Sequence, residues 1–228
     1  MDLQERLTGF AMLGATWVMW LLVALSIIGL AIVFERIFFM LLSRDNIQRL
    51  RHEITALLRR GDIEGTRDRL AQSKSFEAQV VKAGVENAEG GIAAVKEHME
   101  GETRLARLKM ERNLAFLGTV GNNAPFIGLL GTVIGVMRAF QELNASEGRV
   151  TGGLMSEIGE ALVATAIGIL VALPSVAFFN AFQRIIKARI MRAESLGNVL
   201  IAHMESDHHA SLQPQAPSQP QVVASEGV

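Results

Sequence analysis

The sequence predicts an all-α membrane protein with three transmembrane helices and a helical cytoplasmic domain. Residues 7–34, 113–137 and 161–183 contain no Lys, Arg, Asp or Glu, and these stretches are 28, 25 and 23 residues long. A transmembrane helix needs about 20 apolar residues, so each stretch can cross a bilayer. Three such stretches in a chain of 228 residues argue against the buried helices of a soluble protein.

The first apolar stretch is expected to remain in the protein as a transmembrane helix at about Phe10–Phe34. The residues before it include Asp2, Glu5 and Arg6, so this leader is not basic. The stretch is also longer than the 7–15-residue core of a signal peptide. We therefore interpret it as the first span and not as a cleaved signal.

The distribution of basic residues predicts the orientation in the membrane. Fourteen of the 22 Lys and Arg residues lie in 43–113 and four lie in 183–192, but only one lies in the first 12 residues and one in 141–153. By the positive-inside rule, 43–113 and the C-terminus are cytoplasmic. The N-terminus and the 141–153 connection are then on the outer side.

Short helices are expected in the cytoplasmic domain, followed by a long helix that enters the membrane. Residues 44–60 are amphipathic, and Asp62 and Ser75 can each cap another short helix. Residues 92 to about 140 contain no proline except Pro125. We predict one continuous helix over this range, cytoplasmic at first and kinked or loosened near the proline.

Small residues follow one face of the second span and one face of the third. They are Gly128, Gly131, Thr132 and Gly135 in the second span, and Ala161, Ala164, Thr165, Gly168 and Ala172 in the third. Small faces allow membrane helices to approach closely, so packing is their expected role. No Gly-Lys-Ser/Thr sequence follows, which excludes a phosphate-binding loop.

These patterns divide the chain into seven segments. The tail after Glu205 is rich in Pro, Gln, Ser and Ala and is expected to be disordered. The segments are the N-out first transmembrane helix (1–42), the cytoplasmic helical domain (43–113), the second transmembrane helix (114–140), a short periplasmic connection (141–153), the third transmembrane helix (154–182), a cytoplasmic helix extension (183–205) and the disordered tail (206–228).

One carboxylate lies inside the third span. Glu160 is expected about 9 Å from the outer end of that span. A charge in hydrocarbon costs at least about 2.5–3.5 kcal/mol, so such a residue is a candidate for ion transport. The structural alternative is a polar lock between helices or subunits.

Two threonines are predicted to lie at similar depth on antiparallel spans. Thr132 is about 12 Å from the outer end of its span and Thr165 about 16 Å. The alternative is that each hydroxyl bonds a carbonyl of its own helix. Because 161–183 contains no ionisable group, an ion path must use water and hydroxyls, or a carboxylate of another polypeptide.

Two motifs resemble the ExbB/TolQ/MotA proton-channel family, and most closely its ExbB and TolQ branch. They are the segment 124–133, Ala-Pro-Phe-Ile-Gly-Leu-Leu-Gly-Thr-Val, and the segment 160–168, Glu-Ala-Leu-Val-Ala-Thr-Ala-Ile-Gly, followed by Ala-Leu-Pro at 172–174. The similarity is strong over about 92–190. Elsewhere it concerns only the layout of the helices.

The resemblance implies a homopentamer around a central pore in a bacterial inner membrane. Two copies of an ExbD- or TolR-like single-span partner would each thread one helix through the pore, and the partner's membrane aspartate would carry the proton. Thr132 and Thr165 match the family's pore-facing threonines, and Glu160 matches its span-three glutamate. Pro125 and Pro174 match its membrane prolines, which shape the helices.

The sequence departs from the ExbB and TolQ pattern at two places. Residues 155–159 are Met-Ser-Glu-Ile-Gly, where those proteins typically have a Pro-Gly-Ile-Ala run. Glu157 is therefore an additional acid and a candidate pore-mouth residue. Asn122 and Asn123 stand where smaller residues are usual. These differences leave the branch and the choice of ion open.

The function expected from these features is that of a stator subunit, which couples ion flow to mechanical work on a periplasm-spanning partner. Protons are the expected ion, with Na⁺ as the alternative, and no cofactor or metal is expected. No nucleophile–base constellation indicates an enzyme, and near-neutral net charge does not indicate nucleic-acid binding. The alternatives are a specialised motility stator of the same architecture and a passive membrane scaffold or assembly protein.

Overall fold

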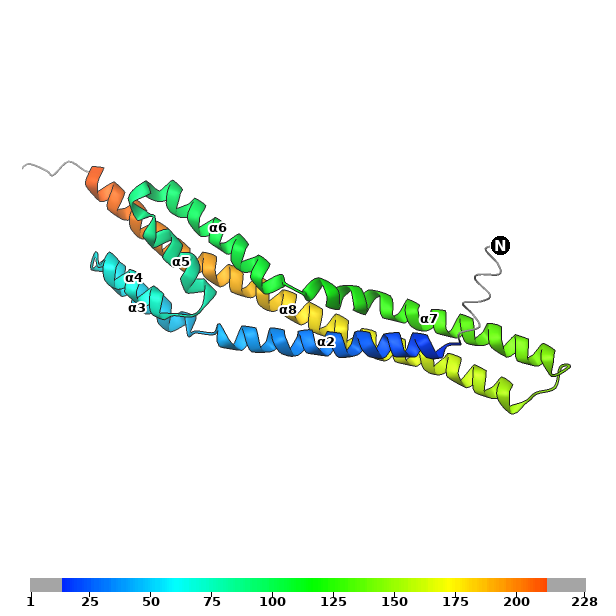
Figure 1. The fold of residues 1–228 in the computed structure, drawn as a ribbon. Helices are drawn as coiled ribbons and strands as arrows, with labels where there is room; N and C mark the ends of the chain where they lie inside the picture. Colours follow the sequence, from blue (N-terminus) through cyan, green and yellow to red (C-terminus); the bar gives the residue numbers. More distant parts are fainter. Residues whose placement is uncertain (1–13, 213–228) are drawn as a thin grey trace, which may run out of the picture. The chain divides into compact units, whose positions relative to one another are not determined.

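The computed structural model describes the backbone of residues 14–212 and the side chains of residues 14–206. Every regular element in this part of the chain is helical, which confirms the predicted all-α fold (Figure 1). The elements are α2 (Thr16–Leu42), α3 (Ile47–Arg59), α4 (Ile63–Gln72), α5 (Phe76–Glu86), the 3₁₀ turn η1 (Ala88–Gly90), α6 (Gly91–Glu111), α7 (Leu114–Ala145) and α8 (Gly152–Leu212).

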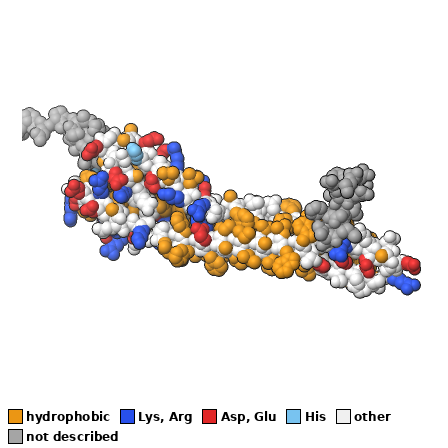
Figure 2. Space-filling view, in the orientation of Figure 1, with side chains coloured by type: hydrophobic (Ala, Val, Ile, Leu, Met, Phe, Trp, Pro, Cys, Tyr) orange, Lys and Arg blue, Asp and Glu red, His pale blue; other side chains and the backbone are white. Residues whose placement is uncertain are grey.

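Three helices are long and apolar enough to cross a membrane, as predicted. They are found in Thr16–Arg59, Leu114–Ala145 and Gly152–Ser206. On α2 large apolar side chains such as Phe34, Phe38 and Leu42 are 59–68% exposed. Figure 2 shows apolar side chains gathered over α2, whereas charged side chains gather over the short helices α3–α5. An exposed apolar surface of this extent is suited to contact with lipid.

The chain folds into two compact units. The first unit comprises the chain up to Arg44 together with Arg104–Met191, and it contains α2, α7 and the apolar part of α8. The second unit comprises Asp45–Thr103 and the chain from Arg192 onward, and it contains α3, α4, α5, η1, the first part of α6 and the last part of α8.

The core of the first unit is formed by apolar side chains of α2, α7 and α8. Trp17, Leu25, Phe116, Ile127 and Ile167 pack around a buried cluster. The members of the buried cluster are Val18, Leu22, Val120, Ala124, Ile134, Val171 and Ala172. Each of the three long helices therefore turns one stripe towards its neighbours and leaves the rest of its apolar surface exposed.

The prediction of one continuous helix over 92–140 is wrong. The helix ends at Glu111 and a new helix begins at Leu114. Asn113 has φ 63, in the left-handed region, which breaks the chain of helical hydrogen bonds. Asn adopts this conformation more readily than most residues with a side chain. Pro125 lies further along, inside α7, which continues through it.

The end of α6 is held by Arg36 of α2, a residue that is 2% exposed. Its Nη1 donates hydrogen bonds to the carbonyl oxygens of Lys109 (2.9 Å) and Met110 (3.4 Å). Carbonyls in the last turn of a helix have no partner within it, so Arg36 satisfies groups that the break would leave free. The guanidinium also pairs with Glu35 and lies 4.9 Å from the ring centroid of Phe39.

A second buried arginine holds the end of α2. Arg189 of α8 is 5% exposed. Its guanidinium donates to the hydroxyl of Ser43 (2.8 Å) and to the carbonyl oxygen of the same residue, which is the C-cap of α2. Arg36 and Arg189 are thus buried arginines that each bond the end of a neighbouring helix.

The short helices of the second unit begin at side-chain caps. Asp62 and Ser75 cap α4 and α5, which confirms the two predicted caps, and Asn46 caps α3. Each side-chain oxygen accepts a hydrogen bond from the backbone N–H three residues later. These bonds satisfy N–H groups that have no partner inside the helix.

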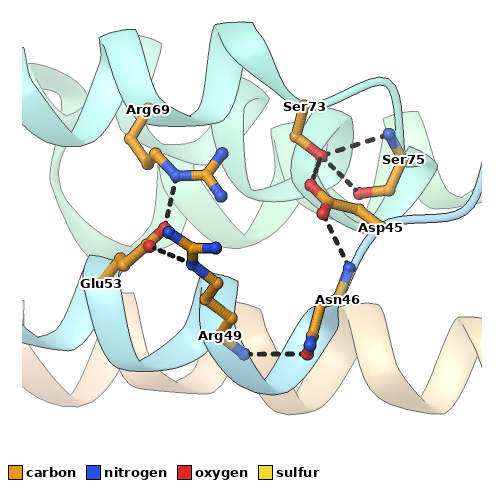
Figure 3. A network of polar contacts seen from close by, with 7 residues as sticks. All are labelled: Asp45, Asn46, Arg49, Glu53, Arg69, Ser73 and Ser75. Carbon is orange, nitrogen blue, oxygen red and sulfur yellow. Dashed lines mark hydrogen bonds and ion pairs between the residues drawn. The ribbon is translucent and has the colours of Figure 1, made fainter.

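A polar network joins the start of α3 to the segment between α4 and α5 (Figure 3). Asp45 accepts hydrogen bonds from the Ser73 hydroxyl (2.5 Å) and from the Asn46 N–H (2.7 Å), and the two hydroxyls of Ser73 and Ser75 are 3.0 Å apart. The Ser73 hydrogen bond is the main reason that the pKa of Asp45 lies below its usual value. Asp45 therefore holds its negative charge firmly.

The helix bounds differ in places from the predicted segments. The end of α2, Leu42, coincides with the end of the predicted segment 1–42 and lies beyond Phe34, the predicted end of the apolar span; the predicted start of that span at Phe10 lies outside the described residues. The last helix continues to Leu212, so the first part of the tail predicted to be disordered, 206–212, is helical. The rest of that tail lies outside the described residues.

Replacing Arg36 should destabilise the first unit. Arg36→Met keeps an unbranched side chain but leaves the Lys109 and Met110 carbonyls without their donor. A buried polar group without a partner costs about 1–3 kcal/mol, so thermal unfolding in detergent, followed by Trp fluorescence, should begin at a lower temperature. Arg184→Met is the control, because Arg184 is exposed. Equal unfolding temperatures of the two variants would contradict this role of Arg36.

Candidate functional site

The backbones of α7 and α8 are in direct contact at two glycines. A Cβ atom on Gly168 would lie 2.7 Å from the carbonyl oxygen of Ala124 and 3.0 Å from the Cα of Gly128. A Cβ atom on Gly128 would lie 2.9 Å from the carbonyl oxygen of Ala164. No side chain fits at either position, which explains the small residues on these faces.

This contact brings the two predicted threonines together. The Thr165 hydroxyl donates a hydrogen bond across the helix interface to the carbonyl oxygen of Gly128 (3.1 Å). The same hydroxyl lies 3.5 Å from that of Thr132, at the limit of a hydrogen bond. Thr132 donates to Leu129 of its own helix (2.6 Å), and both threonines are half-buried. The two hydroxyls therefore lie at the same position along the paired helices, as the sequence predicts.

Glu160 contacts the first helix. The Thr16 hydroxyl donates to its Oε1 at 2.6 Å. Thr16 is the first residue of α2, and Glu160 lies in the third turn of α8 and is half-buried. The contact is one physical basis for a polar lock between helices. It also fixes the direction of a carboxylate that could interact with ions.

Glu157 forms an ion pair that was not predicted. Arg138 Nη2 lies 3.2 Å from Glu157 Oε1, and the two side chains are 34% and 20% exposed. The other carboxylate oxygen, Oε2, is buried and has no hydrogen-bond partner within the described residues. The sequence could have indicated this ion pair. Arg138 and Glu157 lie at comparable distances from the connection between the two antiparallel spans, so they are expected at the same level of the helix pair. Arg138 therefore offsets the charge of the predicted pore-mouth acid.

The two membrane prolines lie inside continuous helices. Pro125 is half-buried in α7, and Pro174 is exposed in α8. Neither proline has an N–H, so each leaves one carbonyl of the preceding turn without a helical partner. Near Pro125, Asn122 and Asn123 are exposed, and the Asn123 side chain donates to the carbonyl oxygen of Thr119 (2.8 Å).

The middle of the pair formed by α7 and α8 carries hydroxyls and no titratable side chain. Residues 113–137 and 161–183 contain no Asp, Glu, Lys, Arg or His. In the described part of the chain, no group of three or more His, Cys, Asp and Glu side chains could hold a metal ion. The chemistry available at mid-membrane is therefore hydrogen bonding to water, to an ion or to a group from another polypeptide.

Comparison with known proteins identifies relatives of this chain. Residues 72–195 match the MotA/TolQ/ExbB proton channel family. The putative biopolymer transport protein ExbB-like 2 of Helicobacter pylori is 40% identical over 83 residues, which is 36% of this chain and 55% of that protein. The Tol-Pal system protein TolQ of Pseudomonas aeruginosa is 40% identical over 92 residues, which is 37% of this chain and 40% of that protein.

A longer match extends beyond the two motifs. The biopolymer transport protein ExbB of Pseudomonas putida is 30% identical over 176 residues, which is 72% of this chain and 53% of that protein. The chain thus spans about half or less of the length of these curated relatives. Both site motifs fall inside the residues that match the family, 72–195.

Replacing Gly168 should separate α7 from α8. In Gly168→Ala the new methyl group would meet the Ala124 carbonyl oxygen. Forcing extra volume into a packed interface typically costs about 1–3 kcal/mol, so the variant should unfold at a lower temperature in detergent. Gly159→Ala is the matched control on the same helix, because no described atom beyond its own turn of helix lies within 4 Å of its Cβ position. A Gly168→Ala variant as stable as Gly159→Ala would show that the contact is not tight.

Proposed function

The chain belongs to the MotA/TolQ/ExbB proton channel family, and we propose that it is the stator subunit of an ion-driven machine in a bacterial inner membrane. It would couple ion flow to work on a partner that reaches across the periplasm. Family membership and three apolar helices support a channel-type membrane subunit of an energy-transducing system. The coupling to a periplasmic partner is our proposal.

The observation that carries this proposal is the pair of hydroxyls at the contact between α7 and α8. Thr165 and Thr132 are 3.5 Å apart and half-buried, in a region of the two spans without titratable side chains. Hydroxyls in such a position can hold water and present a polar surface to an ion. They cannot by themselves take up a proton at ordinary pH, because the Ser and Thr hydroxyl is not a titrating group.

We therefore propose that a partner polypeptide supplies the titrating group. An ExbD- or TolR-like single-span protein with a membrane aspartate, present in two copies within a homopentamer of this chain, would fit this need. Protons are the proposed ion and Na⁺ is the alternative, and no cofactor is required. In the proposed orientation the N-terminus is periplasmic and the C-terminus cytoplasmic, in agreement with the basic residues of 43–113.

Two alternative functions can be tested by experiment. A specialised motility stator would use the same pathway with a different driven machine. A passive scaffold would use Glu160 only as a structural lock, and the Thr16–Glu160 hydrogen bond is the observation that favours it. Glu157 is proposed as an acid at the outer end of the pathway, with its charge offset by Arg138.

The hydroxyls should be needed for flux and not for assembly. Thr165→Val and Thr132→Val are nearly isosteric, and each removes a hydroxyl from the pair. Proton flux into vesicles that contain the chain and its partner should fall at least about tenfold, which corresponds to about 1.4 kcal/mol. Co-purification of the partner should persist. Thr119→Val is the control, because the Thr119 hydroxyl donates to the carbonyl oxygen of Ala115 in its own helix. Full flux in the double variant would refute the proposed pathway.

Variants at Glu160 and Thr16 distinguish a carboxylate that acts in ion flux from one that only holds two helices together. Glu160→Gln keeps the shape of the side chain, and Thr16→Val removes the hydrogen bond while leaving the carboxylate in place. Under the proposal, Glu160→Gln should abolish flux at normal membrane levels, while Thr16→Val should retain most of it. If both variants lose the same stability and the same flux, the lock explains Glu160 without an ion pathway.

A further inference from the structure

The second unit contains a groove between α3 and the last part of α8. Two adjoining cavities of 660 and 430 Å³ form it, and both are lined by Gln48 and Arg51. Residues of α8 complete the wall, including Arg192, Leu196 and Val199. The groove lies entirely within the second unit and uses no residue of the site described above.

The lining of the groove has an excess of positive charge, with three arginines and one aspartate. Arg51, Arg59 and Arg192 line it, and none of the three side chains has an ion pair or hydrogen bond in the part of the chain that the structure describes. The acid among the lining residues is Asp45, which accepts its hydrogen bonds from the Ser73 hydroxyl and a backbone N–H. Exposed arginines without a partner favour an anionic ligand.

The groove is also partly apolar. Ala56 of α3 is exposed and Val199 of α8 is half-buried in the lining, and Leu196 lies beneath them, 1% exposed. The planar guanidinium group matches the geometry of a phosphate, to which it can donate two parallel hydrogen bonds. A ligand that combines a phosphate with a hydrocarbon portion would therefore use both parts of the lining.

Chain connectivity keeps one end of the groove near the membrane surface. Asp45 follows Leu42, the last residue of α2, by three residues, and Leu42 is 59% exposed. Three residues reach at most about 11 Å. Because a bilayer is about 40–45 Å thick with its headgroups and about 30 Å without them, each headgroup layer is about 5–8 Å thick. Asp45, a residue of the groove lining, therefore lies at most about 11 Å from the end of the first apolar helix, a distance comparable to the thickness of the headgroup layer.

We propose that this groove binds the phosphate headgroup of an anionic phospholipid from the cytoplasmic leaflet. Arg51 and Arg192 bind the phosphate, and Ala56 and Val199 contact the adjoining glycerol and acyl carbons. Basic pockets on the cytoplasmic side of membrane proteins are suited to such headgroups. The site is independent of the ion pathway, so its occupancy can be measured without ion flux.

The test is lipid binding to the purified, delipidated full chain, measured by native mass spectrometry. Phosphatidylglycerol should bind at least about tenfold more tightly than phosphatidylcholine, because its net negative charge is attracted to both arginines. Arg51→Gln with Arg192→Gln should remove this preference. Arg60→Gln with Lys74→Gln is the control, because it removes two exposed positive charges of the second unit outside the groove.

Several results would overturn the proposal. They are equal binding of the two lipids to the wild type, an unchanged preference in the groove variant, and full displacement of phosphatidylglycerol by millimolar inorganic phosphate, which would indicate a site for free anions. Arg51→Lys with Arg192→Lys guards against misfolding, because it keeps the charge and should keep most of the preference. A photoreactive residue in place of His52 should cross-link to lipid. Cross-linking to a second copy or another polypeptide in place of lipid would assign the groove to a protein contact.

Discussion

The direct contact between the backbones of α7 and α8 is the interaction on which the candidate site depends. At Gly128 and Gly168 no side chain separates the two helices, and a Cβ atom at either glycine would meet backbone atoms of the other helix. Only at this separation can the Thr165 hydroxyl reach the Gly128 carbonyl of the facing helix and lie beside the Thr132 hydroxyl. The close packing of the two helices thus fixes the positions of the two threonine hydroxyls, which are the polar groups of this interface.

Several polar groups near the ends of the spans are paired, as a low-dielectric surrounding favours. Arg36 and Arg189 bond helix ends, Arg138 pairs with Glu157, and Thr16 bonds Glu160. Between these ends the two helices of the site have hydroxyl and amide groups only. This arrangement separates groups that fix the helices from groups that remain available to water or to a partner.

The sequence predicted the features that depend on composition along a single helix. Charge-free stretches identified the three apolar helices, and residue spacing placed Thr132 and Thr165 at similar depth. It failed where one residue or one distant contact decides the structure. Asn113 breaks the long helix by its own left-handed conformation. The role of Arg36 depends on Lys109, a partner that lies 73 residues away, so periodicity could not reveal it.

The Arg36 contact also bears on how the protein is made. Its carbonyl partner lies 73 residues later in the chain, which at about 5–20 residues per second is synthesised about 4–15 s after Arg36. During that interval the first helix enters the bilayer with an arginine whose final acceptors do not exist. A long arginine side chain near a helix end can extend to the lipid headgroups. The buried contact of Arg36 with the Lys109 carbonyl can therefore form only after α6 has been translated, so the packing of α2 is completed later than its synthesis.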